Sequence, residues 1–426
     1  MTHPVPTAEQ KRQAFAAGRA DGLAQLAGTD PSSRIGPADG RSERFVWYAD
    51  DSSLTLVVGE QEDSDTDLAL AVGLGERGDR DLRLVLPRGW HDPTLHRWAW
   101  LADLPIEVWS HDWQHDTDGS PPKQEGRPTR DQTQQLVRSV DKPQLHLGDR
   151  TSWIEGLLRW AGSKDDLDAS HRQDTRAWQC RGQRVLRVRR AQGGLEILAG
   201  IDWGANSAQP SPQALMITGP LTAAEETTCR ALVEAGINER LDVAGAAHHA
   251  DEHWLQAVLR RHPRSLGLEQ PVLREVAAWR PRGSLKHTKD SQQRQTGTIS
   301  RSPARGRGFV DLAGLDAAGN LLIVETKLGA DHMLVLQGLD YKIWAEANRA
   351  RLSARLDCRP DLPIEISYCV GGKNGSAPTR SAHPQAQLAA LAPDIRWHVQ
   401  EVTDWTGDDP RARRGALRTF PLPPQG

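Results

Sequence analysis

Cysteine is rare in this sequence, and its few copies are scattered. The four cysteines, Cys180, Cys229, Cys358 and Cys369, form no Cys-x-x-Cys pair. Structural zinc sites and the disulfide frameworks of secreted proteins both depend on grouped or paired cysteines. We therefore expect reduced thiols, and neither a disulfide framework nor a cysteine-based zinc site.

The sequence also lacks long hydrophobic runs and an excess of either charge. No apolar run approaches the roughly 18 residues of a membrane span, and residues 1–20 have no hydrophobic signal-peptide centre. We therefore expect a cytoplasmic protein that does not contact a membrane. With 53 basic and 56 acidic residues the formal net charge is −3, so binding to nucleic acid must depend on local basic patches.

A chain of 426 residues is long enough for two or three domains. Changes in composition divide it into five parts. These are an N-terminal α/β accessory domain (1–115), a linker rich in proline, glycine and charge (116–150), a middle α+β domain (151–245), a C-terminal domain (246–405) and a tail (406–426).

The first two domains show regular elements but no catalytic pattern. In the N-terminal domain we expect a helix from the Thr7–Gln10 capping box to Leu26, a second helix at 93–103, and strands at 44–49, 54–59, 67–75, 81–87 and 105–111. In the middle domain, strands 183–191 and 194–203 meet in a hairpin turn, and Thr222 caps a helix that runs to 241. The first of these strands carries Arg184, Arg187, Arg189 and Arg190. These arginines fit a phosphate-binding face. Alternating arginines are more often the solvated side of a strand, and we prefer that interpretation.

The C-terminal domain has the clearest order of elements. The pattern predicts a helix (251–262), a strand (270–279), a basic loop, two strands (308–316 and 320–327), a helix (331–349), a strand (363–371), a helix (383–391) and a strand (395–402). Gly319 and Asn320 tolerate the positive φ of a tight turn, so the two adjacent strands form a hairpin.

Charged residues gather at one end of this hairpin. Because side chains alternate along a strand, Glu325 and Lys327 share a face, and antiparallel pairing can place Asp311 beside them. A divalent cation such as Mg²⁺ relieves the repulsion between two such carboxylates. The lysine can orient or help deprotonate a water, or stabilise charge on a phosphate.

The flanking helices add further polar residues. Glu252 lies on the apolar face of helix 251–262 with Leu255 and Leu259, and an inward carboxylate needs a partner. Gln337 and Tyr341 lie one turn apart on helix 331–349 and are expected to point the same way.

These residues resemble the PD-(D/E)XK, or restriction-endonuclease-like, nucleases. Asp311, a hairpin and Glu325-Thr326-Lys327 follow the family's pattern, and Gln337-xxx-Tyr341 is similar to the extra motif of RecB-type members. The stretch "GFVDLAGLDAAGNLLIVETKLGAD" looks especially like the nuclease domains of the NucS family, although Val310 replaces the usual proline. The resemblance is confined to the C-terminal domain.

The resemblance implies a fold, a cofactor and residue roles. The fold is α/β, with a C-terminal restriction-endonuclease-like αβββαβ core behind two smaller α/β or α+β accessory domains. The cofactor is Mg²⁺ or Mn²⁺, and the implied metal ligands are Asp311, Glu325, the carbonyl of Thr326, and Glu252. Lys327 is the catalytic lysine, and the catalytic set comprises Asp311, Glu325, Lys327, Glu252, Gln337 and Tyr341.

The short motif by itself has little specificity. Glu9-Gln10-Lys11 and Asp340-Tyr341-Lys342 contain the same spacing, but both lie in predicted helices. Only Glu325-Thr326-Lys327 ends a strand that follows a hairpin and an in-register aspartate. The structural alternative is a salt bridge that caps the strand end.

A basic stretch at 280–307 favours a nucleic-acid substrate. It contains one acid, Asp290, and the basic residues Arg280, Arg282, Lys286, Lys289, Arg294, Arg301, Arg305 and Arg307. Such a loop can neutralise phosphates and release their counterions, although the same composition is typical of a disordered insertion. His249 and His253, one helical turn apart, lack a third ligand, so we expect them at the surface and not in a zinc site.

We therefore expect a metal-dependent nuclease that cleaves nucleic acid, DNA before RNA, in repair or antiphage defence. A catalytically silent nucleic-acid-binding or scaffold module is the alternative. The sequence leaves open endonuclease or exonuclease action, a homodimer, and a partner or ligand that binds the accessory domains.

Overall fold

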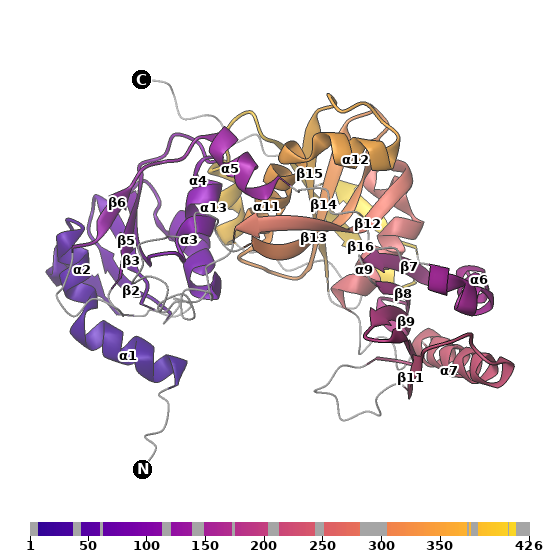
Figure 1. Ribbon diagram of the computed structural model, residues 1–426. Helices are drawn as coiled ribbons and strands as arrows, with labels where there is room; N and C mark the ends of the chain where they lie inside the picture. The colour runs from indigo at the N-terminus through magenta and orange to yellow at the C-terminus, as the bar shows by residue number, and fades with distance from the viewer. Residues whose placement is uncertain are drawn as a thin grey trace, which may run out of the picture.

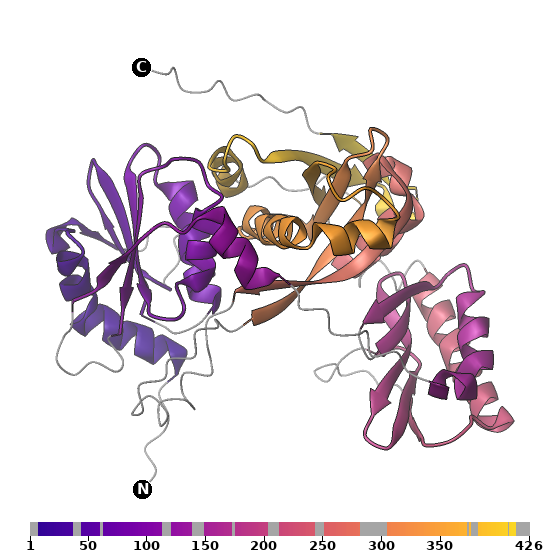
Figure 2. The same ribbon diagram turned by 45° about the horizontal axis from the view of Figure 1, so that its top comes forward.

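The chain forms three β-sheets, each belonging to a different part of the sequence. The computed structural model describes residues 7–36, 44–59, 63–112, 121–138, 149–172, 175–202, 213–242, 251–281, 305–372, 375, 382–407 and 409–414. In both views the C-terminal sheet lies between the N-terminal sheet and the middle sheet (Figure 1, Figure 2).

The N-terminal domain is a six-stranded sheet flanked by helices. Its strands are β1 (Arg34–Ile35), β2 (Val46–Ala49), β3 (Ser53–Val57), β4 (Asp81–Pro87), β5 (Ile106–His111) and β6 (Lys123–Glu125), in that spatial order. Its helices are α1 (Ala8–Gly18), α2 (Ala20–Leu26), η1 (Pro31–Ser33), α3 (Asp63–Glu76), α4 (Asp92–Trp98) and α5 (Arg130–Val137). The predicted capping box of Thr7 and Gln10 is confirmed at α1.

Two predictions for this region are wrong. Residues 67–75, expected as a strand, lie in helix α3, because β3 and β4 are parallel and a parallel pair needs a crossover connection. Residues 116–150 are not simply a linker, since β6 pairs with β5, and Trp100 Nε1 donates to Thr133 Oγ1 of α5 at 2.9 Å.

The N-terminal and C-terminal domains share one hydrophobic core. Leu70 of α3 and Leu339 of α11 (Leu334–Ala347) belong to the same cluster of buried side chains. Arg97, which is fully buried, donates to both carboxylate oxygens of Asp340 at 2.9 and 2.7 Å and to Asp67 Oδ1 at 2.6 Å. The N-terminal segment is therefore packed into the same body as the C-terminal domain.

The middle domain has its own core under an antiparallel sheet. Its strands are β7 (Asp168–Arg172), β8 (Thr175–Cys180), β9 (Gln183–Ala191), β10 (Gly194–Ala199) and β11 (Gln213–Ile217), and its helices are η2 (Asp149–Ile154), α6 (Glu155–Gly162) and α7 (Ala223–Leu241). The predicted β9–β10 hairpin and the Thr222 cap of α7 are confirmed.

The C-terminal domain contains the helix and strand order that the sequence predicts. The elements are α9 (Glu252–Arg261), η4 (Pro263–Leu266), β12 (Leu268–Pro281), β13 (Arg305–Asp316), β14 (Leu321–Leu328), α11, α12 (Arg349–Leu356), β15 (Ile364–Gly371), α13 (Ala382–Ala389), β16 (Arg396–Thr403), η7 (Trp405–Gly407) and β17 (Arg411–Arg414). The sheet order is β12-β13-β14-β15-β16-β17, with parallel pairing only between β14 and β15 and between β15 and β16. Residues 411–414 therefore belong to the sheet, and the expectation that 406–426 is only a tail is wrong for them.

The two faces of β14 pack against different cores, as the alternation predicts. Leu321 and Ile323 join the core under α11, whereas Leu322 and Val324 join the core under α9. The end of β14 therefore lies between α9 and α11. No helix in the described parts of the chain is long and apolar enough to cross a membrane.

Candidate active site

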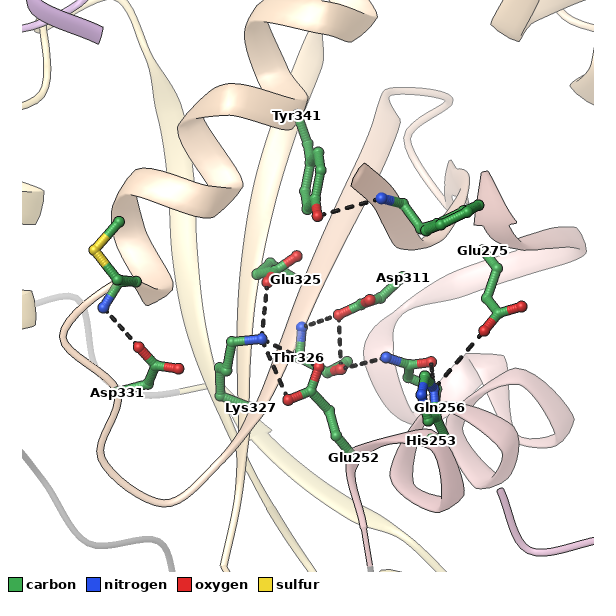
Figure 3. Close-up of polar contacts among 12 residues, drawn as sticks. Glu252, His253, Gln256, Glu275, Asp311, Glu325, Thr326, Lys327, Asp331 and Tyr341 are labelled. Carbon is green, nitrogen blue, oxygen red and sulfur yellow. Dashed lines mark hydrogen bonds and ion pairs between the residues drawn. The ribbon is translucent and has the colours of Figure 1, made fainter. Parts of the chain in front are cut away.

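Lys327 connects β14 to helix α9. Its Nζ lies 3.1 and 3.2 Å from the two carboxylate oxygens of Glu252 and 3.2 Å from Oε1 of Glu325 (Figure 3). Glu252 is the first residue of α9, whose N-cap Asp251 accepts a hydrogen bond from Trp254 N at 2.9 Å. Lys327 is therefore the partner that an inward carboxylate at Glu252 was expected to need.

Asp311 lies where the hairpin ladder ends. The paired residues of β13 and β14 end at Leu312 and Val324, so Asp311 falls opposite Glu325. Its Oδ2 accepts hydrogen bonds from the main-chain N of Thr326 at 2.7 Å and from Thr326 Oγ1 at 2.8 Å. The carboxylate thus occupies a position that a main-chain carbonyl would take in a continued ladder, and it is held close to Glu325.

The carboxyl groups of Asp311 and Glu325 both lie in surroundings that disfavour the ionised form. Burial, followed by repulsion from Glu252, raises the pKa of Asp311 to about 6, although Lys327 and Thr326 act in the opposite direction. Burial and then repulsion from Asp311 raise the pKa of Glu325 well above its ordinary value. Paired buried carboxyls of this kind are frequent in functional sites.

Lys327 remains a cation in this cluster. Burial alone would lower its pKa, but Glu325, Glu252 and Asp311 together raise it. The ammonium is therefore suited to stabilising negative charge and poorly suited to accepting a proton at neutral pH.

Gln256, which the sequence interpretation missed, supports the site from α9. It lies one turn after Glu252 and is 1% exposed, and its Nε2 donates to Thr326 Oγ1 at 3.2 Å. Its Oε1 lies 3.3 Å from His253 Nδ1 (Figure 3). The i, i+4 spacing from Glu252 was a signal that could have identified it.

Glu275 is a second residue that the sequence interpretation missed, and it carries a carboxylate. It is buried on β12 with a φ of 50°, and the flanking register, Arg274 with Leu312 and Val276 with Val310, places it opposite Asp311. A positive φ at a residue other than glycine costs on the order of 1–3 kcal/mol and is concentrated at functional sites. No sequence signal marks this position, since glutamate is not a residue that favours positive φ.

The α11 motif is only partly assembled. Tyr341 points toward the carboxylates (Figure 3), and burial followed by Glu325 and Asp311 raises its phenol pKa. Its hydroxyl accepts a hydrogen bond from Phe309 N at 3.4 Å. The Oε1 of Gln337 is buried without a hydrogen-bond partner among the described residues, so its part in the site stays a prediction.

The expected basic loop needs two corrections. Arg280 is the penultimate residue of β12, where its Nη1 lies 3.0 Å from Asp67 and 3.6 Å from Asp340, so it belongs to the ion-pair network between the domains. Arg305 and Arg307 lie in β13, paired with Pro281 and Trp279, and not in a loop. The remaining basic residues of the stretch lie outside the described residues: Arg282, Lys286, Lys289, Arg294 and Arg301.

Two other predictions concern basic and histidine residues elsewhere. Two arginines of β9 pair with acids, Arg184 with Asp202 at 2.9 Å and Arg189 with Glu196 at 2.5 Å, and Arg189 and Arg190 are exposed. These contacts and exposures agree with the preferred interpretation of a solvated strand. His249 lies outside the described residues, while His253 is half exposed and its Nδ1 lies 3.8 Å from Glu275.

The oxygen ligands present fit a small divalent cation. Glu325 Oε2 is buried without a hydrogen-bond partner among the described residues, beside Asp311. Within the described ranges no three His, Cys, Asp or Glu side chains form a ready-made metal cage. Mg²⁺ is commonly held by one or two carboxylates together with water and substrate phosphate, so this set is compatible with Mg²⁺ or Mn²⁺.

Comparison of the chain with protein-family models, with curated proteins and with solved structures gave no match.

Proposed function

We propose that the protein is a metal-dependent nuclease that hydrolyses phosphodiester bonds in nucleic acid, with DNA as the favoured substrate. The proposal includes a restriction-endonuclease-like catalytic core built from α9 to β15. The observation that carries it is the convergence of Asp311, Glu325 and Lys327 at the end of β14, where one buried oxygen of Glu325 has no hydrogen-bond partner in the described part of the chain. A strand-capping salt bridge would not need two carboxylates with raised pKa values beside one cation.

Each residue has a role that follows from its contacts. Asp311 and Glu325 would hold the cation, which when bound activates water and neutralises phosphate charge. Lys327, kept protonated, would stabilise the charge that develops on the phosphate. Glu252 anchors the Lys327 ammonium, and Thr326 fixes the carboxylate of Asp311 through two hydrogen bonds.

The substrate class rests on sequence as well as on the site. The basic residues between β12 and β13 would follow the phosphate backbone, and their contribution should weaken as salt rises. The accessory domains would then recognise the substrate or a partner.

The direct test is cleavage by purified protein of plasmid, linear duplex, single-stranded DNA and RNA, each with Mg²⁺ or Mn²⁺. Lys327→Ala should reduce the cleavage rate about 10²–10³-fold, since it removes one well-placed charge-stabilising group. Asp311→Ala should abolish metal-dependent cleavage while nucleic-acid binding persists or tightens, because a negative charge is removed.

Lys342→Ala provides a matched control. Lys342 belongs to the helical Asp-x-Lys copy, is similarly buried and pairs with Glu346. Its substitution should leave cleavage within a few-fold of wild type. Equal effects of the Lys327 and Lys342 substitutions would place any activity elsewhere in the chain. Binding without cleavage, for all substrates and both metals, would favour the scaffold function instead.

A further inference from the structure

Helix α9 contacts both the candidate active site and the middle domain. At its N-terminus Glu252 pairs with Lys327, and one turn later Gln256 donates to Thr326. At the other end of the helix, Arg260 Nη1 donates to the carbonyl of Ala169 in β7 at 3.0 Å. The helix that completes the site is therefore also fixed to the middle domain.

The turn between β8 and β9 abuts the first turn of α9. Gly182 has a φ of 78°, and a Cβ at this position would lie 2.1 Å from Trp254 N and 2.7 Å from Asp251 Oδ1. Only glycine allows this approach of two backbones. Arg181, in the same turn, lies over the indole of Trp254, with Cζ 5.0 Å from the ring centroid.

Arg274 joins the same two parts from the side of β12. It is 7% exposed, and its Nη2 donates to Gln179 Oε1 of the middle domain at 2.8 Å and to the carbonyl of His253 in α9 at 2.9 Å. A buried guanidinium that bridges two elements fixes their separation, because moving either element leaves a buried donor without its acceptor.

We propose that Arg274 and the Arg181–Gly182 turn of the middle domain position Glu252, so that docking of the middle domain sets the geometry of the site. Arg274 and Gly182 are positioning residues, since they act on the site through α9. Through Glu252, a shift of α9 would move the Lys327 ammonium, and through Gln256 it would disturb the Thr326 hydroxyl that holds Asp311. A partner or ligand that displaces the middle domain would therefore lower activity without touching the site. This inference rests on the proposed nuclease function only for its activity readout.

Gly182→Ala tests the contact, and Gly193→Ala is its matched control. Both glycines lie in hairpin turns of the middle domain with positive φ, 78° and 88°, but nothing lies within 4 Å of a Cβ at Gly193. Both substitutions thus impose similar backbone strain, and only the first presses on α9. Gly182→Ala should lower kcat roughly 10- to 100-fold relative to Gly193→Ala, with little change in KM, because it misplaces the reacting groups.

Two further measurements separate this inference from the nuclease proposal. In hydrogen exchange, Gly182→Ala should speed exchange of the α9 amides more than Gly193→Ala does, whether or not the protein cleaves nucleic acid. In a Glu252→Gln background, Gly182→Ala should cause less additional loss of activity than it does in the wild type, since part of its effect passes through Glu252.

The outcomes are distinct. Faster α9 exchange without any nuclease activity would support the coupling and reject the proposed function. Equal exchange and equal kcat for the two glycine variants would reject the coupling and leave the proposed function standing. If Gly182→Ala fails to fold, Gln179→Leu, which removes the acceptor for Arg274, replaces it, and unchanged α9 exchange in that variant would also reject the coupling.

Discussion

Asp311→Asn should stabilise the folded protein at neutral pH. The folded state raises the pKa of Asp311 from 3.8 to about 6, so an ionised Asp311 disfavours folding at any higher pH. A shift of about two pKa units corresponds to about 3 kcal/mol in the free energy of unfolding. Asparagine keeps an oxygen to accept from Thr326, but its amide hydrogens need partners, so we expect a gain of about 1–3 kcal/mol at pH 7.5.

The pH dependence has a defined sign. When folding raises the pKa of an acid, the ionised acid lowers the free energy of unfolding at pH values above its pKa in the folded state. This loss disappears as pH falls below the pKa of the acid in the unfolded state. The advantage of Asp311→Asn should therefore shrink between about pH 6 and 3.8. Urea unfolding at pH 7.5, 6 and 4.5, followed by tryptophan fluorescence, measures the difference in the free energy of unfolding between the variant and the wild type.

Asp316→Asn is the control on the same strand. Asp316 accepts hydrogen bonds from the main-chain N of Ala318 at 2.9 Å and of Asn320 at 2.8 Å, as a structural turn residue does. Its substitution should be neutral or destabilising by about 0.5–1 kcal/mol. A loss of stability for Asp311→Asn at pH 7.5 would refute the reasoning and identify Asp311 as an ordinary strand-capping partner. Mg²⁺ should also raise the unfolding temperature of the wild type and not that of Asp311→Asn.

Three further predictions concern stability and support of the site. Arg97→Met should lower the free energy of unfolding by about 3–5 kcal/mol, because it leaves the buried Asp340 carboxylate without its main partner. Arg130→Met, at a half-exposed ion pair, should lower it by less than about 1 kcal/mol. Equal losses in denaturant unfolding would contradict the role of the buried network. Burial lowers the pKa of His96 to about 4, so its contribution to stability is present above pH 6.5 and is lost as pH falls toward 4, and His96→Leu should flatten the slope of stability against pH in this window. Gln256→Leu should lower kcat while changing the free energy of unfolding little, and kinetics and denaturant unfolding of the same variant would show this. An unchanged kcat would mean that the amide only fills space.

The sequence alone was sufficient to predict features that depend on residues close together in the chain. Thr7 forms the predicted capping box and Thr222 the predicted helix cap, because a cap depends on residues three positions apart. The turn after Asp316 and the alternation along β14 placed Glu325 and Lys327 on one face for the same reason. The inward position of Glu252 followed from helical periodicity.

The tertiary structure decided the features that depend on distant residues. The run at 67–75 is apolar enough for a strand or a helix, and only the parallel neighbours β3 and β4 require the helix. Arg280 was predicted to contact nucleic acid because a basic stretch follows it in the sequence. Its partners are instead Asp67 and Asp340, which are far away in the sequence. Glu275 becomes a neighbour of Asp311 only through strand pairing and a positive φ that local sequence does not favour. The sequence therefore determined which residues face inward, whereas long-range packing determined which of them meet, since burial is a periodic property and pairing of charges is a property of the assembled fold.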